Sequence, residues 1–292
     1  MRKAARRGGR VFGIGPEVDL GFPINWLGDD LALLGKLPKT AAAAFAEAQR
    51  PALILGGGAL AKGALGAALK AAESLNLVRP STSSGQAAWN GYNVLHMAAA
   101  RMAGLLLGYA QPGGIADIVK AAPEVLLLLG ADEVDQTRFA SAFKIYIGHH
   151  GDKGAAGADL VLPGAAYSEK HGTFVNIEGR VQRSERATFP PGEAREDWTI
   201  FRALSDLLGK PLPFDRFDSL RAAMIAEVPM LGRDGLIDLP WAPPGLDAKA
   251  EGAVTYPIKD FYLTNAICRA SPTMRRCSEE LLHGVNYAEA AE

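Results

Sequence analysis

Residues 145–182, IYIGHHGDKGAAGADLVLPGAAYSEKHGTFVNIEGRVQ, decide the fold class of this chain. Two apolar runs, Lys144–Ile147 and Asp159–Leu162, flank a glycine-rich connection. Strands that are apolar without alternation are typical of sheets buried on both faces, as parallel sheets are. The segment ends in GTFVNIEGRVQ, where Asn176 and Gly179 readily adopt turn conformations, so a β-hairpin is predicted there.

The same pattern of strands and helices extends toward the amino end of the chain. Two further strands are predicted at Ala52–Leu55 and Val125–Leu129. Helices are predicted at Thr40–Gln49, Leu60–Ser74, Tyr92–Leu106 and Gly114–Ala121. Strands and helices in alternation predict an α/β fold with a doubly wound, mostly parallel sheet.

The part of the chain that follows the hairpin is predicted to be helical and then irregular. An amphipathic helix at Glu196–Leu208 has acidic residues in its first turn and ends before Gly209 and Pro211. Its apolar face is predicted to comprise Ile200, Phe201, Leu204, Leu207 and Leu208. A second helix is predicted at Phe217–Val228.

Composition changes after residue 228, and three parts are therefore predicted. Residues 1–228 form the α/β domain, and 229–257, rich in proline and glycine, form an irregular linker. Residues 258–292 form a carboxy-terminal helical tail, in which Lys259–His283 is predicted to be an amphipathic docking segment.

Size and charge restrict the classes of function that the chain can have. A chain of 292 residues can bury a substantial core. Its 31 basic and 32 acidic residues nearly cancel, so no overall field attracts nucleic acid or an anionic membrane. The apolar runs are far shorter than the roughly 18 residues that span a bilayer, so a membrane would be met only through partners. The basic start, MRKAARRGGR, lacks the apolar core of a secretory signal and is interpreted as a solvated tail.

The two cysteines are too few for the common metal centres. Cys268 and Cys277 lie near the carboxyl end, and no CxxC motif accompanies them. Iron-sulfur clusters and structural zinc sites typically need four protein ligands. Both thiols are therefore predicted to be reduced and free, and no metal site is predicted.

A glycine-rich turn after the first strong strand offers a competing interpretation as a nucleotide site. Gly56, Gly58 and Ala61 have GxGxxA spacing before a helix, a pattern found in dinucleotide-binding domains. The acidic residue expected about 20 positions later is missing, and there is no GxxxxGK[ST] motif. A tight strand-to-helix turn is favoured, with an independent NAD-dependent enzyme kept as an alternative.

The polar residues of the central segment do not predict catalysis. If His149 and His150 continue their strand, their side chains point to opposite faces, which disfavours a shared metal. They lie beyond the carboxyl end of a buried strand, where α/β sheets bind ligands, but hydrogen bonding to the glycine-rich loop is favoured. Ser168, Glu169 and His171 are close in sequence, but no GxSxG elbow surrounds them, and no catalytic residue is predicted.

The motifs together resemble those of a known family. GADLVLP, Glu169, GT and NIEGRVQ resemble the molybdopterin oxidoreductase signature. The GHHGDKGAAGA opening, the early VFGIGPEVDLGFPINWLGD and the tail IKDFYLTNAICRASPTMRRCSEELL resemble one branch of it. That branch is the large iron-sulfur subunit, of the 75 kDa type, of proton-pumping NADH:quinone oxidoreductase, complex I. The resemblance covers nearly the whole chain.

The resemblance implies a fold of the molybdopterin oxidoreductase type used as a scaffold. Full-length members bind 2Fe-2S and 4Fe-4S clusters through an amino-terminal region whose ligands this sequence lacks, so no cofactor is expected here. The sequence is expected to be the carboxy-terminal part of that subunit, from a truncated or split gene, with MRKAARRGGR as an internal linker. The signature positions, expected to hold no cofactor and to have no catalytic role, are His149, Glu169, Gly172, Asn176, Gly179 and Arg180.

Partners and location follow from the same resemblance. The expected partners are the other peripheral-arm subunits of complex I and a separate cluster-bearing amino-terminal polypeptide. The expected location is the cytoplasmic side of a bacterial inner membrane, or the matrix side in mitochondria. Alone, the chain is expected to be inactive. The alternative is a fragment of a molybdopterin-dependent oxidoreductase, such as a formate dehydrogenase-like enzyme.

Overall fold

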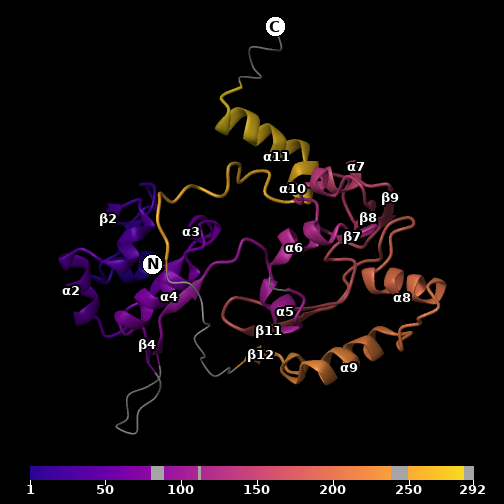
Figure 1. Cartoon of the computed structure of the whole chain (residues 1–292), viewed down its shortest axis with the longest axis horizontal. Coiled ribbons are helices and arrows are strands. Elements are labelled where there is room, and N and C mark those ends of the chain that lie inside the picture. Colours follow the sequence, from indigo (N-terminus) through magenta and orange to yellow (C-terminus); the bar gives the residue numbers. More distant parts are fainter. Residues whose placement is uncertain (80–88, 111–112, 238–248, 286–292) are drawn as a thin grey trace. The chain divides into compact units, whose positions relative to one another are not determined.

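The structure, a computed structural model, describes residues 1–79, 89–110, 113–237 and 249–285 (Figure 1). Its contacts divide the chain into two compact units. The first comprises Met1–Ala99 and Asp238–Lys259, and the second comprises Ala100–Ile237 and Asp260–Glu292. Each unit therefore combines one long stretch of the chain with a shorter segment from later in the sequence.

The first unit contains three small sheets among its described residues. Two are parallel pairs and one is an antiparallel pair: β1 (Phe12–Ile14) with β2 (Asn25–Gly28), β3 (Leu53–Leu55) with β6 (Tyr92–Val94), and β4 (Val78–Arg79) with β5 (Trp89–Asn90). The helices are α1 (Arg2–Ala5), the 3₁₀ turn η1 (Leu31–Gly35), α2 (Lys39–Glu47), α3 (Gly57–Ala61) and α4 (Leu65–Ser74).

Small side chains let the helices of the first unit pack closely on β3. The buried core contains three alanines beside two leucines: Leu31, Leu55, Ala59, Ala64 and Ala68. The returning segment 249–259 also packs here, since Val254 contacts this core. The Val254 N–H donates to the Asp29 carbonyl at 2.9 Å, which fixes the segment to the loop before η1.

The second unit is organised around a parallel and an antiparallel sheet. The parallel sheet consists of β7 (Val125–Leu129), β8 (Phe143–Gly148) and β9 (Leu160–Pro163), with β8 in the centre. The antiparallel sheet consists of β10 (Gly172–Val175), β11 (Arg180–Ser184) and β12 (Gly235–Leu236). Val175, Val181 and Leu231 form a fully buried cluster behind that second sheet.

Helices and turns surround these two sheets. Those before residue 217 are α5 (Arg101–Leu106), α6 (Gly114–Ala121), the 3₁₀ turn η2 (Gln136–Phe139), α7 (Lys153–Ala156) and α8 (Asp197–Leu207). The later ones are α9 (Phe217–Glu227), the 3₁₀ turn η3 (Pro229–Gly232), α10 (Ala266–Ala270), α11 (Pro272–Cys277) and a π-helical turn, η4 (Ser278–Leu282). Within the parts of the chain described, no helix combines the length and apolarity needed to cross a membrane.

Most elements predicted from the sequence are confirmed to within about two residues. Strands β3, β7, β8 and β9, helices α2, α6, α8 and α9, and the β10-β11 hairpin all lie where the pattern places them. The predicted apolar face of α8 is only partly correct, because Leu207 and Leu208 are exposed. The structure is thus a mixed helix and strand fold with small parallel sheets.

Two helix predictions need correction. The helix predicted at Leu60–Ser74 is broken into α3 and α4 at Gly63, whose φ of +73° is incompatible with a continuous helix. The helix predicted at Tyr92–Leu106 is wrong in its first part, because Tyr92–Val94 pairs with β3 as a strand. Helix α5 begins only after Ala100, which has a left-handed φ of +53°.

The predicted linker and tail also differ in detail from the structure. The composition of 229–257 predicts irregular structure, but η3 and β12 lie within these residues, and 238–248 lie outside the described residues. In the tail, helical structure begins only at Ala266, and residues 259–265 are turns and bends. Cys268 and Cys277 lie on α10 and α11 with free thiols, as predicted.

Candidate functional site

The candidate site lies at the carboxyl edge of the parallel sheet β7-β8-β9. Parallel strands end at one edge, and ligands of open α/β sheets bind in the crevice outside that edge. Three connections leave the sheet here: Asp132 follows β7, His149–Lys153 follows β8, and Gly164 follows β9. The signature residues predicted from the sequence begin at the same edge.

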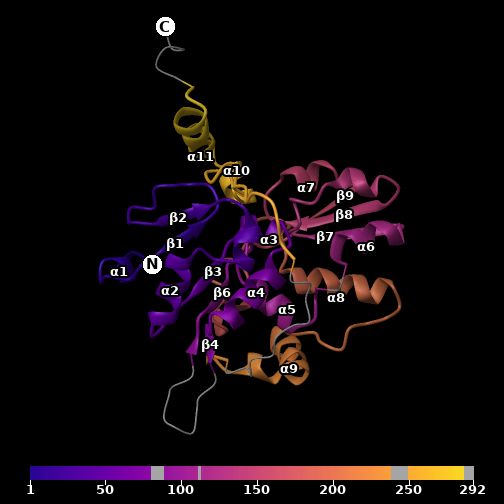
Figure 2. The ribbon, with the colours of Figure 1, turned by 60° about the vertical axis from the view of Figure 1, so that its left-hand side comes forward.

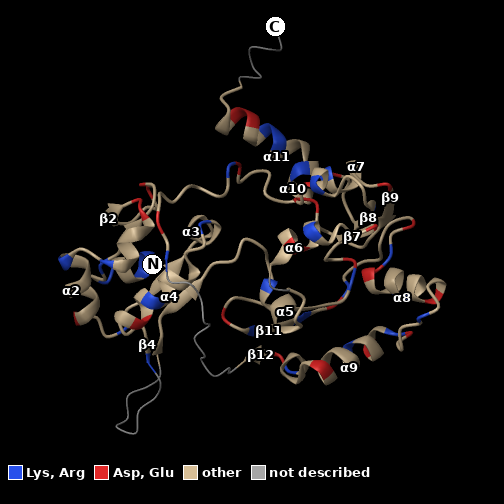
Figure 3. Ribbon diagram, viewed as in Figure 1, with Lys and Arg blue, Asp and Glu red and all other residues tan. Residues whose placement is uncertain are grey.

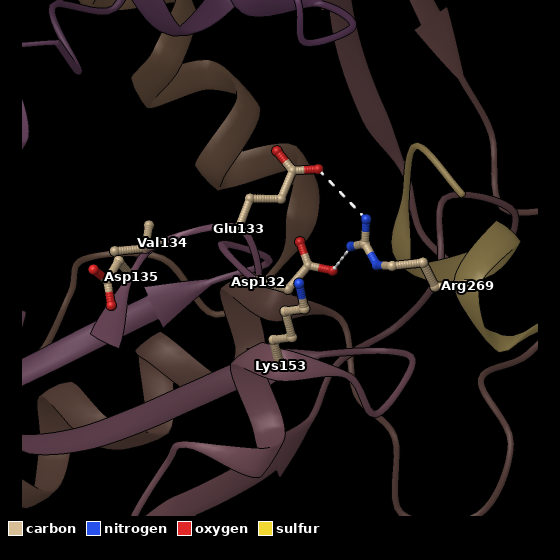
Figure 4. A pocket seen from close by; sticks show the side chains of 6 residues that line it. All are labelled: Asp132, Glu133, Val134, Asp135, Lys153 and Arg269. Atoms are coloured by element: carbon tan, nitrogen blue, oxygen red, sulfur yellow. Dashed lines mark hydrogen bonds and ion pairs between the residues drawn. The ribbon is translucent and has the colours of Figure 1, made fainter. Parts of the chain in front are cut away.

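The edge is occupied by an arginine from the tail. Arg269 of α10 forms ion pairs with Asp132 (Nη2–Oδ2, 2.5 Å) and, through Nε, with Asp152. A third acid, Glu133, lies 3.7 Å from Nη1, and Nη1 donates to the Leu263 carbonyl at 3.2 Å. Figure 4 shows the guanidinium beside the first acids after β7. Because Asp152 follows β8, one cation joins two strand ends to the tail.

The charges of this network are mostly removed from water. The side chains of Arg269, Asp132 and Asp152 are only 19%, 10% and 16% exposed to solvent. Burial opposes ionisation of Asp152, but the hydrogen bond from Arg269 and further favourable contacts outweigh it, and the pKa of Asp152 is lowered. Close by lies Tyr146 of β8, whose pKa is raised by burial and then by the two aspartates.

A pocket of about 380 Å³ opens beside this network (Figure 4). It is lined by Asp132, Glu133, Val134, Asp135, Lys153 and Arg269. Its basic and acidic groups largely neutralise one another. Asp135 is also engaged locally, since its carboxylate accepts from the Thr137 hydroxyl at 2.6 Å. The charged groups at this edge are therefore largely paired within the chain.

The two histidines do not continue strand β8, so the condition under which their side chains would point to opposite faces is not met. Strand β8 ends at Gly148, and His149 and His150 follow it. Their Nδ1 atoms are 2.6 Å apart, and the rings meet edge to face. Partial burial, His150 and Lys170 lower the pKa of His149. At this distance one ring nitrogen can donate to the other, so a single hydrogen bond satisfies the geometry.

The residues that follow β9 are tied to the amino end of α8. Lys170 Nζ lies 2.5 Å from Asp197 Oδ2, and the His171 Nδ1 lies 3.3 Å from Glu196 Oε1. The Glu169 carboxylate accepts from the Ala166 N–H at 2.9 Å, which closes the loop after β9. These contacts have an evident structural role: they attach the signature loop to a helix.

The signature residues of the hairpin turn are also used within the hairpin itself. The Asn176 carboxamide oxygen accepts from the N–H groups of Glu178 and Arg180, both at 3.0 Å. Gly179 has a φ of +81°, a conformation that glycine adopts at low cost. Gly172 begins β10, where an added Cβ would lie 2.7 Å from the Phe174 ring. Arg180 is exposed and lies 3.9 Å from Glu178.

A second pocket of about 380 Å³ lies between this hairpin and the start of α9. The His171 ring stacks on Phe217, with ring centres 4.9 Å apart. Arg183 binds Asp234 through two nitrogens at 2.9–3.2 Å. Arg183, one of the cations that line this pocket, is thus also paired with an acid of the chain.

The sequence analysis missed the three residues that define the edge. Asp132 and Asp152 each follow a strand, and that position was a usable signal. Arg269 had no such signal, because it lies 137 and 117 residues from these partners. Over the residues that the structure describes, no group of three or more histidine, cysteine or acidic side chains is arranged to hold a metal ion.

Comparison with known proteins places this geometry in context. Residues 1–207 match the molybdopterin oxidoreductase family, and residues 240–277 match a family described as the C-terminal region of an NADH-ubiquinone oxidoreductase subunit. The chain is 40% identical to the mitochondrial NADH-ubiquinone oxidoreductase 78 kDa subunit of Neurospora crassa and 38% identical to that of Candida albicans. It is 34% identical to the NADH-ubiquinone oxidoreductase 75 kDa subunit of Reclinomonas americana. These matches cover 91–92% of this chain but only 37–40% of the relatives' length.

Proposed function

The chain belongs to the molybdopterin oxidoreductase family, and from this premise we propose that it is the carboxy-terminal part of the large iron-sulfur subunit of complex I. In this proposal it is a non-catalytic scaffold of the peripheral arm. The family match of residues 240–277 and the three relatives support this branch over a formate dehydrogenase-like enzyme. Complex I transfers electrons from NADH to quinone and pumps protons, and the chain would contribute to that activity only within the complex.

The observation that carries the scaffold role is the occupation of the sheet edge by Arg269. In a ligand-binding α/β fold this crevice would receive the ligand. Here the carboxylates of Asp132 and Asp152 form ion pairs with the Arg269 guanidinium of the same chain, and these contacts hold the tail at the sheet edge. The edge thus has a structural use that competes with ligand binding.

We propose that the residues of this chain do not fit a molybdopterin cofactor. The signature polar groups are used in local bonds: Asn176 holds the hairpin turn, Glu169 holds the loop after β9, and His149 pairs with His150. Thiolate ligands for a metal would have to come from Cys268 and Cys277, which lie on the tail helices. No catalytic or cofactor-binding role is therefore assigned to the six signature residues.

Electron transfer, partners and location follow as further parts of the proposal. The iron-sulfur clusters would be held by an amino-terminal region that this sequence does not include. The chain would bind other peripheral-arm subunits and reach the membrane only through them, on the cytoplasmic side in bacteria or the matrix side in mitochondria. Figure 3 shows both signs of charge spread along each unit, which fits protein partners better than nucleic acid.

We also propose that the sheet is doubly wound and that the chain has three parts. A doubly wound sheet is supported by the parallel order of β7-β8-β9 and by strands that are apolar on both faces. The boundaries 1–228, 229–257 and 258–292 would be tested by limited proteolysis, with cleavage expected within 229–257.

A combined test separates the scaffold from an enzyme. The purified chain is expected to contain no iron, flavin, molybdenum or pterin fluorescence and to oxidise no NADH. It is expected to associate with the peripheral-arm subunits when the cluster-bearing region is supplied. Bound molybdenum and pterin after expression in a competent host would favour the formate dehydrogenase-like alternative. Failure to associate with any arm subunit would defeat the scaffold role.

A further inference from the structure

One face of the parallel sheet β7-β8-β9 is apolar and largely open to solvent. The register Val125↔Phe143 and Leu127↔Ile145↔Leu160 places these side chains on the same face. Ile147, near the carboxyl end of this face, is buried. Five other apolar side chains of this face are 39–51% exposed: Val125, Leu127, Leu129, Phe143 and Leu160. They belong to three adjacent strands, so they form one continuous patch, called here the open face.

The opposite face of the same sheet is covered at β7 and β8, whereas Val161 of β9 is exposed there. Leu128 and Tyr146 point to that side and are 4% and 2% exposed. Helix α7 packs there, since a Cβ added at Gly154 would strike the Tyr146 ring. Figure 2 shows α7 beside the three strands. The asymmetry is therefore between two faces of one sheet and does not reflect poor packing of the whole unit.

An apolar face of a parallel sheet is expected to be covered in the assembled protein. Parallel sheets carry helices on both faces, because their strands are apolar on both sides. Every side chain of the open face is aliphatic or aromatic, which suits the apolar stripe of an amphipathic helix. Helix α6 directly precedes β7 but does not serve as a full cover, since its Ile115 and Ile118 are themselves 45% exposed.

We propose that the open face binds amphipathic helices from the part of the large subunit that lies outside this chain. The relatives supply the argument, since this chain spans only 37–40% of their length and more than half of each lies outside the match. The open face needs a cover, and the remainder of the same subunit is long enough to supply one. The inference rests on the proposed function, because it takes its partner from the same subunit.

Two neighbouring residues of β9 provide a matched pair of variants. Leu160 lies on the open face and is 42% exposed, whereas Val161 points to the opposite face and is 47% exposed. Leu160→Glu places a charge on the proposed interface, and Val161→Glu places the same charge one residue away on the other side. Circular dichroism and the melting temperature of each variant would establish that both fold like the unaltered chain.

Binding would be measured by pull-down and titration with a polypeptide that carries the rest of the large-subunit sequence from the same genome. The unaltered chain and Val161→Glu are expected to bind alike, while Leu160→Glu weakens binding at least tenfold. As a second readout, the added thiol of Leu127→Cys would react with a thiol reagent in the free chain and become at least tenfold slower in the complex.

Three other outcomes of these measurements would overturn the inference, each for a different reason. Equal binding of all three chains would remove the open face from the interface and leave the proposed function standing. The unaltered chain could self-associate while Leu160→Glu does not, with binding of the polypeptide unchanged. That result would assign the open face to contact with a second copy of this chain. If the unaltered chain does not bind that polypeptide, the inference fails, and the proposed function is then judged by association with the other arm subunits.

Discussion

Arg269 shows how much depends on a single residue in this chain. Its guanidinium satisfies two mostly buried carboxylates that belong to different strand connections, Asp132 and Asp152. Removing one partner from such a network leaves uncompensated buried charge, which costs more than the pair contributes when intact. Exposed pairs elsewhere in the unit, such as Arg183 with Asp234, lack this asymmetry.

We therefore expect Arg269→Ala to lower the free energy of unfolding by about 2–4 kcal/mol, because both aspartates lose their cation. Arg183→Ala serves as the control, with an expected loss of at most about 1 kcal/mol, since that pair is half exposed. Urea denaturation at pH 7 would measure both. Losses of the same size for the two variants would contradict the importance given to the Arg269 network.

The lowered pKa of Asp152 predicts how stability depends on pH. A carboxylate with a lowered folded pKa stabilises the protein above the unfolded value of about 3.9, and this contribution disappears as the pH falls through the folded pKa. We expect Asp152→Asn to be less stable than the unaltered chain at pH 6. The difference should shrink steadily as the pH falls below about 4. A difference that stays constant down to about pH 2 would show that the charge of Asp152 is not the cause.

At the scale of elements, the glycines of the turn between β3 and α3 serve packing. A Cβ added at Gly58 would strike the Thr255 carbonyl oxygen and lie 2.9 Å from Val254 Cγ1. At Gly56 a Cβ would meet nothing within 4 Å. Close packing of the returning segment 249–259 thus accounts for Gly58, while nothing in the packing requires glycine at position 56.

This contrast gives a prediction about two nearby glycines. Gly58→Ala is expected to cost about 1–3 kcal/mol of stability, as overpacking does, because the Thr255 backbone must move. Gly56→Ala, at a φ of −88° and with nothing within 4 Å, is expected to change stability by less than about 1 kcal/mol, because the backbone tolerates alanine but the N-cap position of α3 favours glycine. Thermal melting of both variants would decide. A destabilised Gly56→Ala with a tolerated Gly58→Ala would reverse the explanation.

Local patterns predicted elements well where the structure is local. The sequence of β7 is apolar throughout, α6 and α8 have helical periodicity, and the hairpin has a recognisable turn at Asn176–Gly179. The pattern failed at Tyr92–Val94, where pairing with β3 overrides helical spacing. It also failed at Gly63, where one left-handed residue divides a helix in two.

At the scale of the whole molecule, the residues that the structure describes include a separate buried cluster in each unit. Leu31 is at the centre of the first, and Leu231, with no exposed surface, is at the centre of the second. Each unit includes a segment distant in sequence, so neither is a simple half of the chain. The two cores predict that damage to one unit will leave the other folded.

Leu31→Ala and Leu231→Ala test this independence. Each removes a buried leucine side chain and is expected to cost about 2–5 kcal/mol within its own unit. Hydrogen exchange should show faster exchange of β3 and α4 in Leu31→Ala, with β10 and β11 unchanged. Leu231→Ala should show the reverse. Faster exchange of all four elements in both variants would indicate a single cooperative unit instead.

The sequence by itself determined the family signature, the strands β7, β8 and β9, the hairpin and the free state of the two cysteines. These features depend on residues that are neighbours along the chain, so periodicity and turn chemistry reveal them. Only the tertiary structure decided that Arg269 closes the edge of the sheet, that 249–259 packs on the first unit, and that one face of the parallel sheet is open. Those features join residues more than a hundred positions apart or depend on what covers a surface, and neither leaves a pattern in a local stretch of sequence.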